Sequence, residues 1–167
     1  MSQSVTTTLS LSTFFVGLTD AQLDMVAAIC EPATYQKGDV LLREHEVSDD
    51  LYVIGSGSIE VLMEPLDDSV ASKSRPSPVA RLVHGQAFGE MALVDHGSRS
   101  ATVRVSEDDT YVLRISREKL TFLCDSYPVL GYRVMRNLAA DLALKIRIAN
   151  LTIRQYQDML TKAEQEE

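Results

Sequence analysis

The stretch FGEMALVDHGSRSATV, residues 88–103, combines a glycine, a carboxylate and an arginine around a short apolar run. Gly89 has no Cβ, so the backbone can lie close to a bound group there. A short helix that starts here would direct free N–H groups toward an anion, and Arg99 has a planar donor fork that suits a phosphate. Glu90 is an acceptor that could hold a sugar hydroxyl. The pattern therefore predicts a compact cradle for a phosphorylated sugar.

The same stretch resembles, without a gap, the phosphate-binding cassette of the cyclic-nucleotide-binding domain family. That cassette reads roughly Phe-Gly-Glu, an apolar residue, Ala-Leu, a turn, and then Pro-Arg followed by Ala, Ser or Thr and by Ala-Thr. Ser98 stands where the family usually has Pro, so we expect a less stiff turn before the arginine. The residues that match are Phe88, Gly89, Glu90, Ala92, Leu93, Arg99, Ser100, Ala101 and Thr102.

Short apolar segments separated by turn residues lie on both sides of the cassette. Strand-like runs or alternation occur at residues 40–42, 51–54, 58–63, 79–83, 101–105 and 110–115. Gly55-Ser56-Gly57 lies between two of them and predicts a hairpin turn. Regularly spaced short strands of this kind predict an antiparallel sandwich or barrel. Residues 64–78 contain three prolines and predict a mobile loop between strands.

The resemblance extends to the segment before the cassette and implies the form of the β region. The matching residues there are Lys37, Gly38, Asp39, Tyr52, Ile54, Gly57, Glu60 and Val61. His45 occupies a position where the family commonly has Gly, so a positive φ there would carry some cost. The fold class implied is α+β: an antiparallel jelly roll, or double-stranded β-helix, with a small N-terminal helix and C-terminal helices that include one long helix.

Helical patterns flank the β region. Thr19 and Gln22 predict a capping box for a helix whose apolar positions continue to Cys30, and Pro32 stops it. Ser116 predicts the start of a helix after the last strand. The predicted division of the chain is a mobile Ser/Thr-rich N-terminus at 1–13, the jelly roll with flanking helices at 14–126, a long helix at 127–161 and an acidic tail at 162–167.

The long helix carries two apolar stripes. One is a seam with the period of a coiled coil, formed by Leu142, Ile146, Ala149, Ile153, Tyr156 and Leu160. A second stripe consists of Leu144, Ile148 and Leu151. We expect the β domain to cover one stripe and a second copy of the helix to cover the other, which makes the protein a homodimer. Only seven residues follow Leu160, so we expect no helix-turn-helix domain.

Composition limits the partners and the compartment. Hydrophobic residues make up 45% of the 167-residue chain and charged residues 24%, which is typical of a soluble globular domain. The formal net charge of −8 argues against nucleic acid as a main partner. No apolar run approaches the ~18 residues of a membrane span, and no secretory signal is evident. Two separated cysteines, Cys30 and Cys124, suggest reduced thiols and a cytoplasmic protein.

The resemblance implies a cyclic-nucleotide sensor with its ligand in the cassette. Arg99 and backbone N–H groups near Ala92 and Ser100 would hold the phosphate, and Glu90 would accept the ribose 2′-hydroxyl. The long helix would cap the purine and close when the ligand binds. The candidate ligand-binding residues are Gly89, Glu90, Met91, Ala92, Arg99, Ser100 and Ala101, the candidate pocket walls are Val83 and Phe88, and the candidate base caps are Lys145 and Ile146.

The identity of the nucleotide depends on the residue after the arginine. Family members with Ala there tend to take cAMP, whereas Thr can bond the guanine amino group and favours cGMP. Ser100 also occurs in members that take cAMP, so we favour cAMP. We expect no cofactor, and a downstream protein partner that the sequence does not identify.

Two other functional classes remain open. The fold could serve as an interaction or dimerisation module whose pocket is empty. A jelly-roll metal enzyme is a weaker alternative, because His45, His84 and His96 are single, widely separated and without the usual spacing of ligands. No nucleophile–base motif stands out, so we predict no catalytic residues and no metal site.

Overall fold

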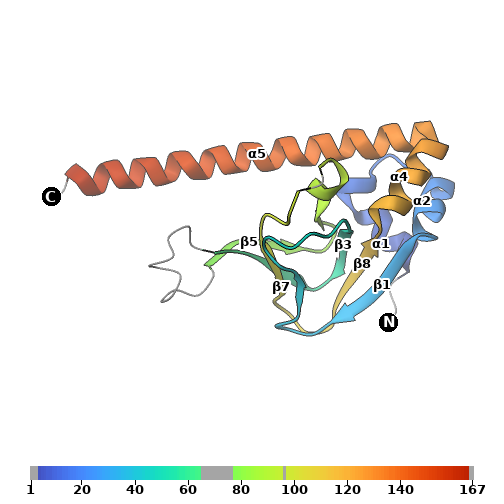
Figure 1. Ribbon diagram of the computed structural model, residues 1–167, viewed down its shortest axis with the longest axis horizontal. Coiled ribbons are helices and arrows are strands. Elements are labelled where there is room, and N and C mark those ends of the chain that lie inside the picture. The colour runs from blue at the N-terminus through green and yellow to red at the C-terminus, as the bar shows by residue number, and fades with distance from the viewer. Residues whose placement is uncertain (1–3, 65–76, 96, 166–167) are drawn as a thin grey trace.

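The chain folds into two packed β-sheets with helices at one end and one long helix across the top (Figure 1). This computed structural model describes residues 4–64, 77–95 and 97–165. The helices are α1 (Val5–Leu11), η1 (Thr13–Phe15), α2 (Asp20–Ala27), η2 (Glu90–Leu93), α4 (Arg117–Ser126) and α5 (Pro128–Gln165). The strands are β1 (Cys30–Tyr35), β2 (Val40–Leu42), β3 (Leu51–Ser56), β4 (Ser58–Met63), β5 (Ser77–Val83), β6 (Ala87–Phe88), β7 (Thr102–Val105) and β8 (Thr110–Ile115).

Both sheets are antiparallel and four-stranded. One has the order β1-β8-β3-β6 and the other the order β2-β7-β4-β5. Except for β4 and β5, the strands that pair are not consecutive in the sequence, as in a jelly roll. The predicted α+β jelly-roll class, with its N-terminal and C-terminal helices, is therefore confirmed.

The first sheet is buried on both faces because it separates two apolar cores. Along β3, Leu51 and Val53 point into a core shared with the helices, while Tyr52 and Ile54 point into the core between the sheets. Successive side chains of a strand point to opposite faces, which explains the unbroken apolar run that the sequence shows at 51–54.

The turn at Gly57 connects the two sheets instead of closing a hairpin. β3 pairs with β6 and β8, whereas β4, which follows the turn, pairs with β5 and β7. The hairpin prediction for Gly55–Gly57 was therefore wrong, since local turn chemistry does not determine which strands pair. Gly57 has φ 80°, and a Cβ there would lie 2.9 Å from the Cα of Thr110.

The N-terminal segment is more ordered than its composition suggested. Residues 5–11 form α1, in which Thr8 and Leu9 are buried against the helical core, so the prediction of a mobile segment at 1–13 was wrong for its described part. The capping box of Thr19 and Gln22 is present as predicted. The helix it starts ends at Ala27, however, and Cys30 begins β1 instead of continuing the helix.

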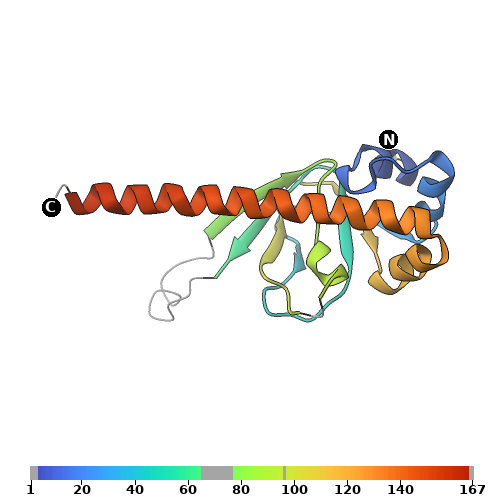
Figure 2. The same cartoon turned by 90° about the horizontal axis from the view of Figure 1, so that it is seen from above.

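The helix α5 has an anchored start and a long exposed end. Its first turns are held by Leu130, Val134 and Leu138 in the helical core, and the side-chain amide of Asn137 donates to the backbone oxygens of Phe14 and Val16 at 3.0 and 2.9 Å. Beyond Lys145, every side chain through residue 163 is exposed, and the helix extends past the sandwich (Figures 1 and 2).

Neither apolar stripe of α5 packs on the β domain as expected. Leu144 is exposed on the side of α5 that faces away from the body, Ile148 and Leu151 are exposed beyond Lys145, and the seam is exposed from Ile146 onward. The predicted acidic tail at 162–167 is helical through Gln165, four residues past the predicted end at 161. Most of the predicted loop at 64–78 lies outside the described residues.

No helix in the described part of the chain is long and apolar enough to cross a membrane. Both cysteines are free thiols.

Candidate functional site

The cassette begins with a left-handed glycine that leads from β6 into η2. Gly89 has φ 77° and precedes Glu90, the first residue of η2. A Cβ at Gly89 would lie 2.7 Å from the backbone oxygen of Asp50 and 2.9 Å from Nη1 of Arg99. Glycine is therefore required both by the backbone conformation and by the close approach of Arg99.

Arg99 is buried, and its side chain connects its own segment to the segment at Ser48–Asp50 and to Gly89. Its Nε donates to Oγ of Ser48 at 2.7 Å, Nη1 to the Gly89 oxygen at 3.1 Å and Nη2 to the Asp50 oxygen at 2.8 Å. Only 6% of the residue is exposed, and this burial lowers the pKa of Arg99 although nearby acidic groups oppose the shift. An arginine has five N–H donors, so among the described residues two remain for an anion.

The backbone of Arg99 is held by the turn that contains His45. The His45 N–H donates to the Arg99 oxygen, and the Arg99 N–H donates to the Glu46 oxygen, both at 2.9 Å. His45 has φ 67°, which agrees with the positive φ that its position in the sequence suggested. His45 therefore adopts a backbone conformation that usually favours glycine, and in that conformation its N–H contacts the backbone of Arg99.

Glu90 is paired with a lysine from α5. It is 6% exposed, and its Oε1 lies 2.8 Å from Nζ of Lys145. The same Nζ lies 2.9 Å from Oδ2 of Asp141 and 3.5 Å from the Ala87 oxygen. Burial works against the ammonium, but attraction to the carboxylates of Glu90 and Asp141 outweighs it and raises the pKa of Lys145.

The side chains of the two predicted base caps, Lys145 and Ile146, point in different directions from α5. Lys145 faces the cassette, whereas Ile146 is 61% exposed and has turned away from it. On a helix, adjacent residues point about 100° apart, so a pair of neighbours cannot both face one site.

The remaining candidates fall into two groups. Ala92 is buried, Ala101 is half-buried, and Met91 and Ser100 are exposed, with the Ser100 hydroxyl 3.9 Å from the Met91 sulfur. Of the predicted pocket walls, Val83 is half-exposed at the end of β5, and Phe88 packs inside the sandwich, stacked on Tyr52 with ring centroids 5.0 Å apart. The structure thus brings Gly89, Glu90, Ala92 and Arg99 together with Lys145.

Sequence reasoning missed three residues of this site. Ser48 and Asp50 orient Arg99, and Asp141 shares the ammonium of Lys145. The i, i+4 spacing of Asp141 and Lys145 was a visible signal, because opposite charges at that spacing meet on a helix. No local pattern marks Ser48 or Asp50 as partners of a residue about fifty positions later.

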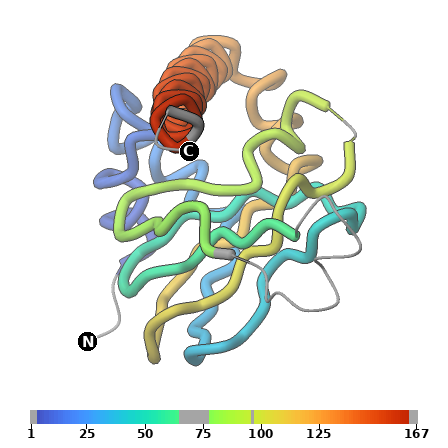
Figure 3. The backbone as a smooth tube through the Cα atoms, turned by 90° about the vertical axis from the view of Figure 1, so that its left-hand side faces the viewer, coloured from blue at the N-terminus to red at the C-terminus, as the bar shows by residue number. Residues whose placement is uncertain are grey.

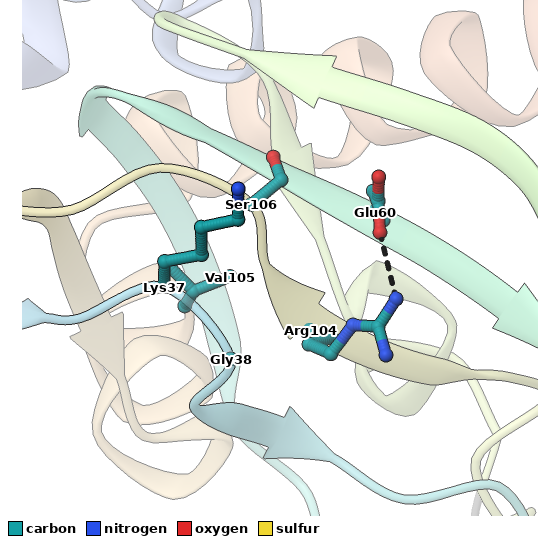
Figure 4. A pocket seen from close by; sticks show the side chains of 6 residues that line it. All are labelled: Lys37, Gly38, Glu60, Arg104, Val105 and Ser106. Carbon is teal, nitrogen blue, oxygen red and sulfur yellow. Dashed lines mark hydrogen bonds and ion pairs between the residues drawn. The ribbon is translucent and has the colours of Figure 1, made fainter.

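A separate hollow of about 410 Å³ lies on the second sheet, away from the cassette (Figure 4). It is lined by Lys37, Gly38, Glu60, Arg104, Val105 and Ser106, and Arg104 is paired with Glu60 at 3.0 Å across it. Among the described residues, no group of three or more His, Cys, Asp or Glu side chains is placed to hold a metal ion.

Comparison with known proteins identifies the family. The model of the cyclic nucleotide-binding domain matches residues 32–127, more than half of the chain. The chain belongs to the cyclic nucleotide-binding domain family. The matched region begins in β1 and ends just before α5, so it contains both sheets and the cassette.

Individual relatives agree with this assignment. The chain is 30% identical over 142 residues to the cyclic AMP receptor protein of Thermus thermophilus, covering 85% of this chain and 61% of the relative. It is 32% identical over 111 residues to a cGMP-dependent protein kinase of Eimeria tenella, covering 65% of this chain and 10% of the kinase. The crystal structure of the Thermus thermophilus catabolite activator protein superposes with a TM-score of 0.72 at 29% identity, over 87% of this chain and 63% of that one. The chain thus spans less than two thirds of the length of these relatives.

Proposed function

We propose that the chain is a sensor that binds a cyclic nucleotide in the cassette and signals by a movement of α5. Arg99 would hold the cyclic phosphate together with N–H groups of η2, and Glu90 would accept the ribose hydroxyl. The observation that carries the proposal is the placement of a buried arginine and a buried carboxylate, both 6% exposed, on either side of the left-handed Gly89. The nucleotide itself is the ligand, without a cofactor or a metal.

We favour cAMP over cGMP as the ligand. The relatives include both a cyclic AMP receptor protein and a cGMP-dependent protein kinase, so overall similarity does not separate the two nucleotides. Ser100 is exposed within the cassette, and serine at this position also occurs in family members that take cAMP. Its hydroxyl lies 3.9 Å from the Met91 sulfur.

The helix α5 is the element that would carry the signal. It lies above the sandwich in Figure 3 and reaches the cassette through the contact between Lys145 and Glu90. A ligand that changes this contact would change the position of the helix. We further propose that α5 pairs with a second copy in a cytoplasmic homodimer and that a downstream protein recognises the change.

Calorimetric titration of the wild-type protein with cAMP and cGMP tests the proposal. We expect cAMP to bind more tightly, and Arg99→Lys to weaken its binding by tenfold or more, because lysine cannot reproduce a bidentate contact with phosphate. Arg104→Lys is the matched control: it makes the same change at an exposed ion pair outside the cassette.

Circular dichroism should show that both variants fold. Wild-type protein that binds neither nucleotide would refute the sensor and favour an interaction module with an empty pocket.

A further inference from the structure

Glu90 is paired with a side chain of the protein itself. In the described part of the chain, its side chain is the least exposed carboxylate in an ion pair, at 8%, against 11% or more for the others. Its partner comes from a different element, α5, which lies beside η2 in both Figures 1 and 2. This pair therefore connects the cassette to the long helix.

Lys145 is also the last side chain of α5, as far as residue 163, that is not exposed. Side chains before it are buried or half-buried at 138, 141, 142 and 143, and those after it are exposed through residue 163. The ammonium contacts Glu90 Oε1, Asp141 Oδ2 and the Ala87 oxygen. The point where the helix leaves the body thus coincides with the carboxylate proposed to receive the ligand.

The ammonium lies against Oε1 of Glu90, so a ribose hydroxyl that binds this oxygen competes with it. A buried carboxylate needs a donor, and in this structure Lys145 supplies it. A ligand hydroxyl that takes the place of the ammonium at Oε1 requires the ammonium to move. Asp141 lies one helical turn before Lys145 and already contacts it at 2.9 Å, so it can keep the ammonium paired after the move.

We propose that Lys145 is an intramolecular latch: it occupies Glu90 in the nucleotide-free protein, and it must transfer to Asp141 before a ribose hydroxyl can bind. This inference rests on the proposed function, since it takes Glu90 as the acceptor for ribose. It adds that the ion pair between Lys145 and Glu90 opposes nucleotide binding. Because binding must break this pair, it also changes how α5 is held.

The first test compares cAMP with 2′-deoxy-cAMP in wild-type protein and in Lys145→Met. In the wild type, the deoxy ligand leaves Glu90 paired with Lys145, whereas in the variant it leaves Glu90 without a donor. We therefore expect Lys145→Met to bind cAMP about fivefold more tightly and to discriminate about fivefold more strongly against the deoxy ligand. Equal discrimination in the two proteins, or weaker binding of cAMP by the variant, would overturn the latch.

Two further variants test whether cAMP affinity changes in the direction that the latch predicts. Asp141→Asn removes the second negative charge beside the ammonium and should weaken cAMP binding, which is the opposite of the effect of Lys145→Met. Lys119→Met is the matched control, because it removes the same charge from an exposed pair with Glu31 on α4 and β1. It should leave both affinities unchanged. A shift in the same direction in both Lys145→Met and Asp141→Asn would contradict the proposal.

A measurement without nucleotide separates this inference from the proposed function. Hydrogen exchange of the α5 amides at 141–150 should be faster in Lys145→Met than in Lys119→Met, because the variant loses the ion pair that joins the helix to Glu90. Unchanged exchange would overturn the latch even if cAMP binds. Wild-type protein that binds no nucleotide would refute the sensor, and the exchange rates alone would then show whether Lys145 holds the helix.

Discussion

Arg99 acts as a structural clamp as well as a ligand candidate. Its side chain joins the segment at Ser48 and Asp50 to Gly89, and its backbone is bonded to the turn at His45. The guanidinium is therefore fixed in orientation before an anion arrives. Such preorganisation lowers the entropic cost of binding.

Burial makes the thiol of Cys30 unreactive. The thiol donates to the Val26 oxygen at 3.2 Å, and burial raises its pKa from 9.0 to about 12. At pH 8 both the ordinary and the raised pKa lie above the pH, and the thiolate fraction falls roughly a thousandfold between them. We predict that iodoacetamide modifies Cys30 far more slowly in the native protein than in urea, as measured by mass spectrometry of tryptic peptides. Equal rates in both states would contradict the burial of this thiol.

At the scale of residues, the sequence predicted the chemistry of the site better than its connections. Gly89, Glu90 and Arg99 were identified because their types and spacing are local. The partner of Glu90 was not, since Lys145 lies on an element that is distant in sequence and had been expected to cap a base. Contacts between distant segments are determined by packing, which no short window of sequence contains.

At the scale of elements, β3 explains why the cassette is rigid. This strand pairs with β8 on one side and β6 on the other, and β6 leads directly into Gly89. With apolar cores on both faces, β3 gives the cassette a fixed base.

The turn at Gly57 provides a test of how the two sheets are joined. Gly57→Ala places a Cβ against Thr110 at positive φ, whereas Gly38→Ala, at φ 97°, meets nothing within 4 Å. We expect Gly38→Ala to lower the free energy of unfolding by about 1 kcal/mol from backbone strain alone. Gly57→Ala should lower it by about 3 kcal/mol, because overpacking is added to the strain. Urea denaturation measures both, and equal losses would show that Thr110 can move aside.

Most strands were predicted within a few residues, but their pairing was not. The segment 110–115 matches β8, and the predicted strand at 79–83 lies within β5. The supposed hairpin at Gly57 and the helix extended to Cys30 failed for one reason: periodicity describes one segment at a time. Pro32 was taken as a helix stop, yet it is accommodated in β1 because that strand lies at the edge of its sheet.

At the scale of the whole molecule, the exposed end of α5 predicts association. Ile153 and Leu160 are 55% and 65% exposed on the seam of period 3.5. We expect the wild type to be a dimer in light scattering and Ile153→Glu/Leu160→Glu to be a folded monomer, because like charges would face each other across the two-fold axis.

A matched control separates the seam from a general effect of charge. Val79→Glu/Phe122→Glu makes the same type of change at exposed apolar residues on β5 and α4. This control should remain a dimer. A wild-type monomer at micromolar concentration would refute the association.

The uninterrupted course of α5 beyond Lys145 makes it a lever arm. From Lys145 to Gln165 the helix extends about 30 Å from its last point of support. A tilt of about 10° at that support, the scale of a rearranged ion pair, would carry the far tip about 5 Å sideways along such a rod. An event at a single carboxylate would thus be amplified into a displacement as large as the spacing of two strands.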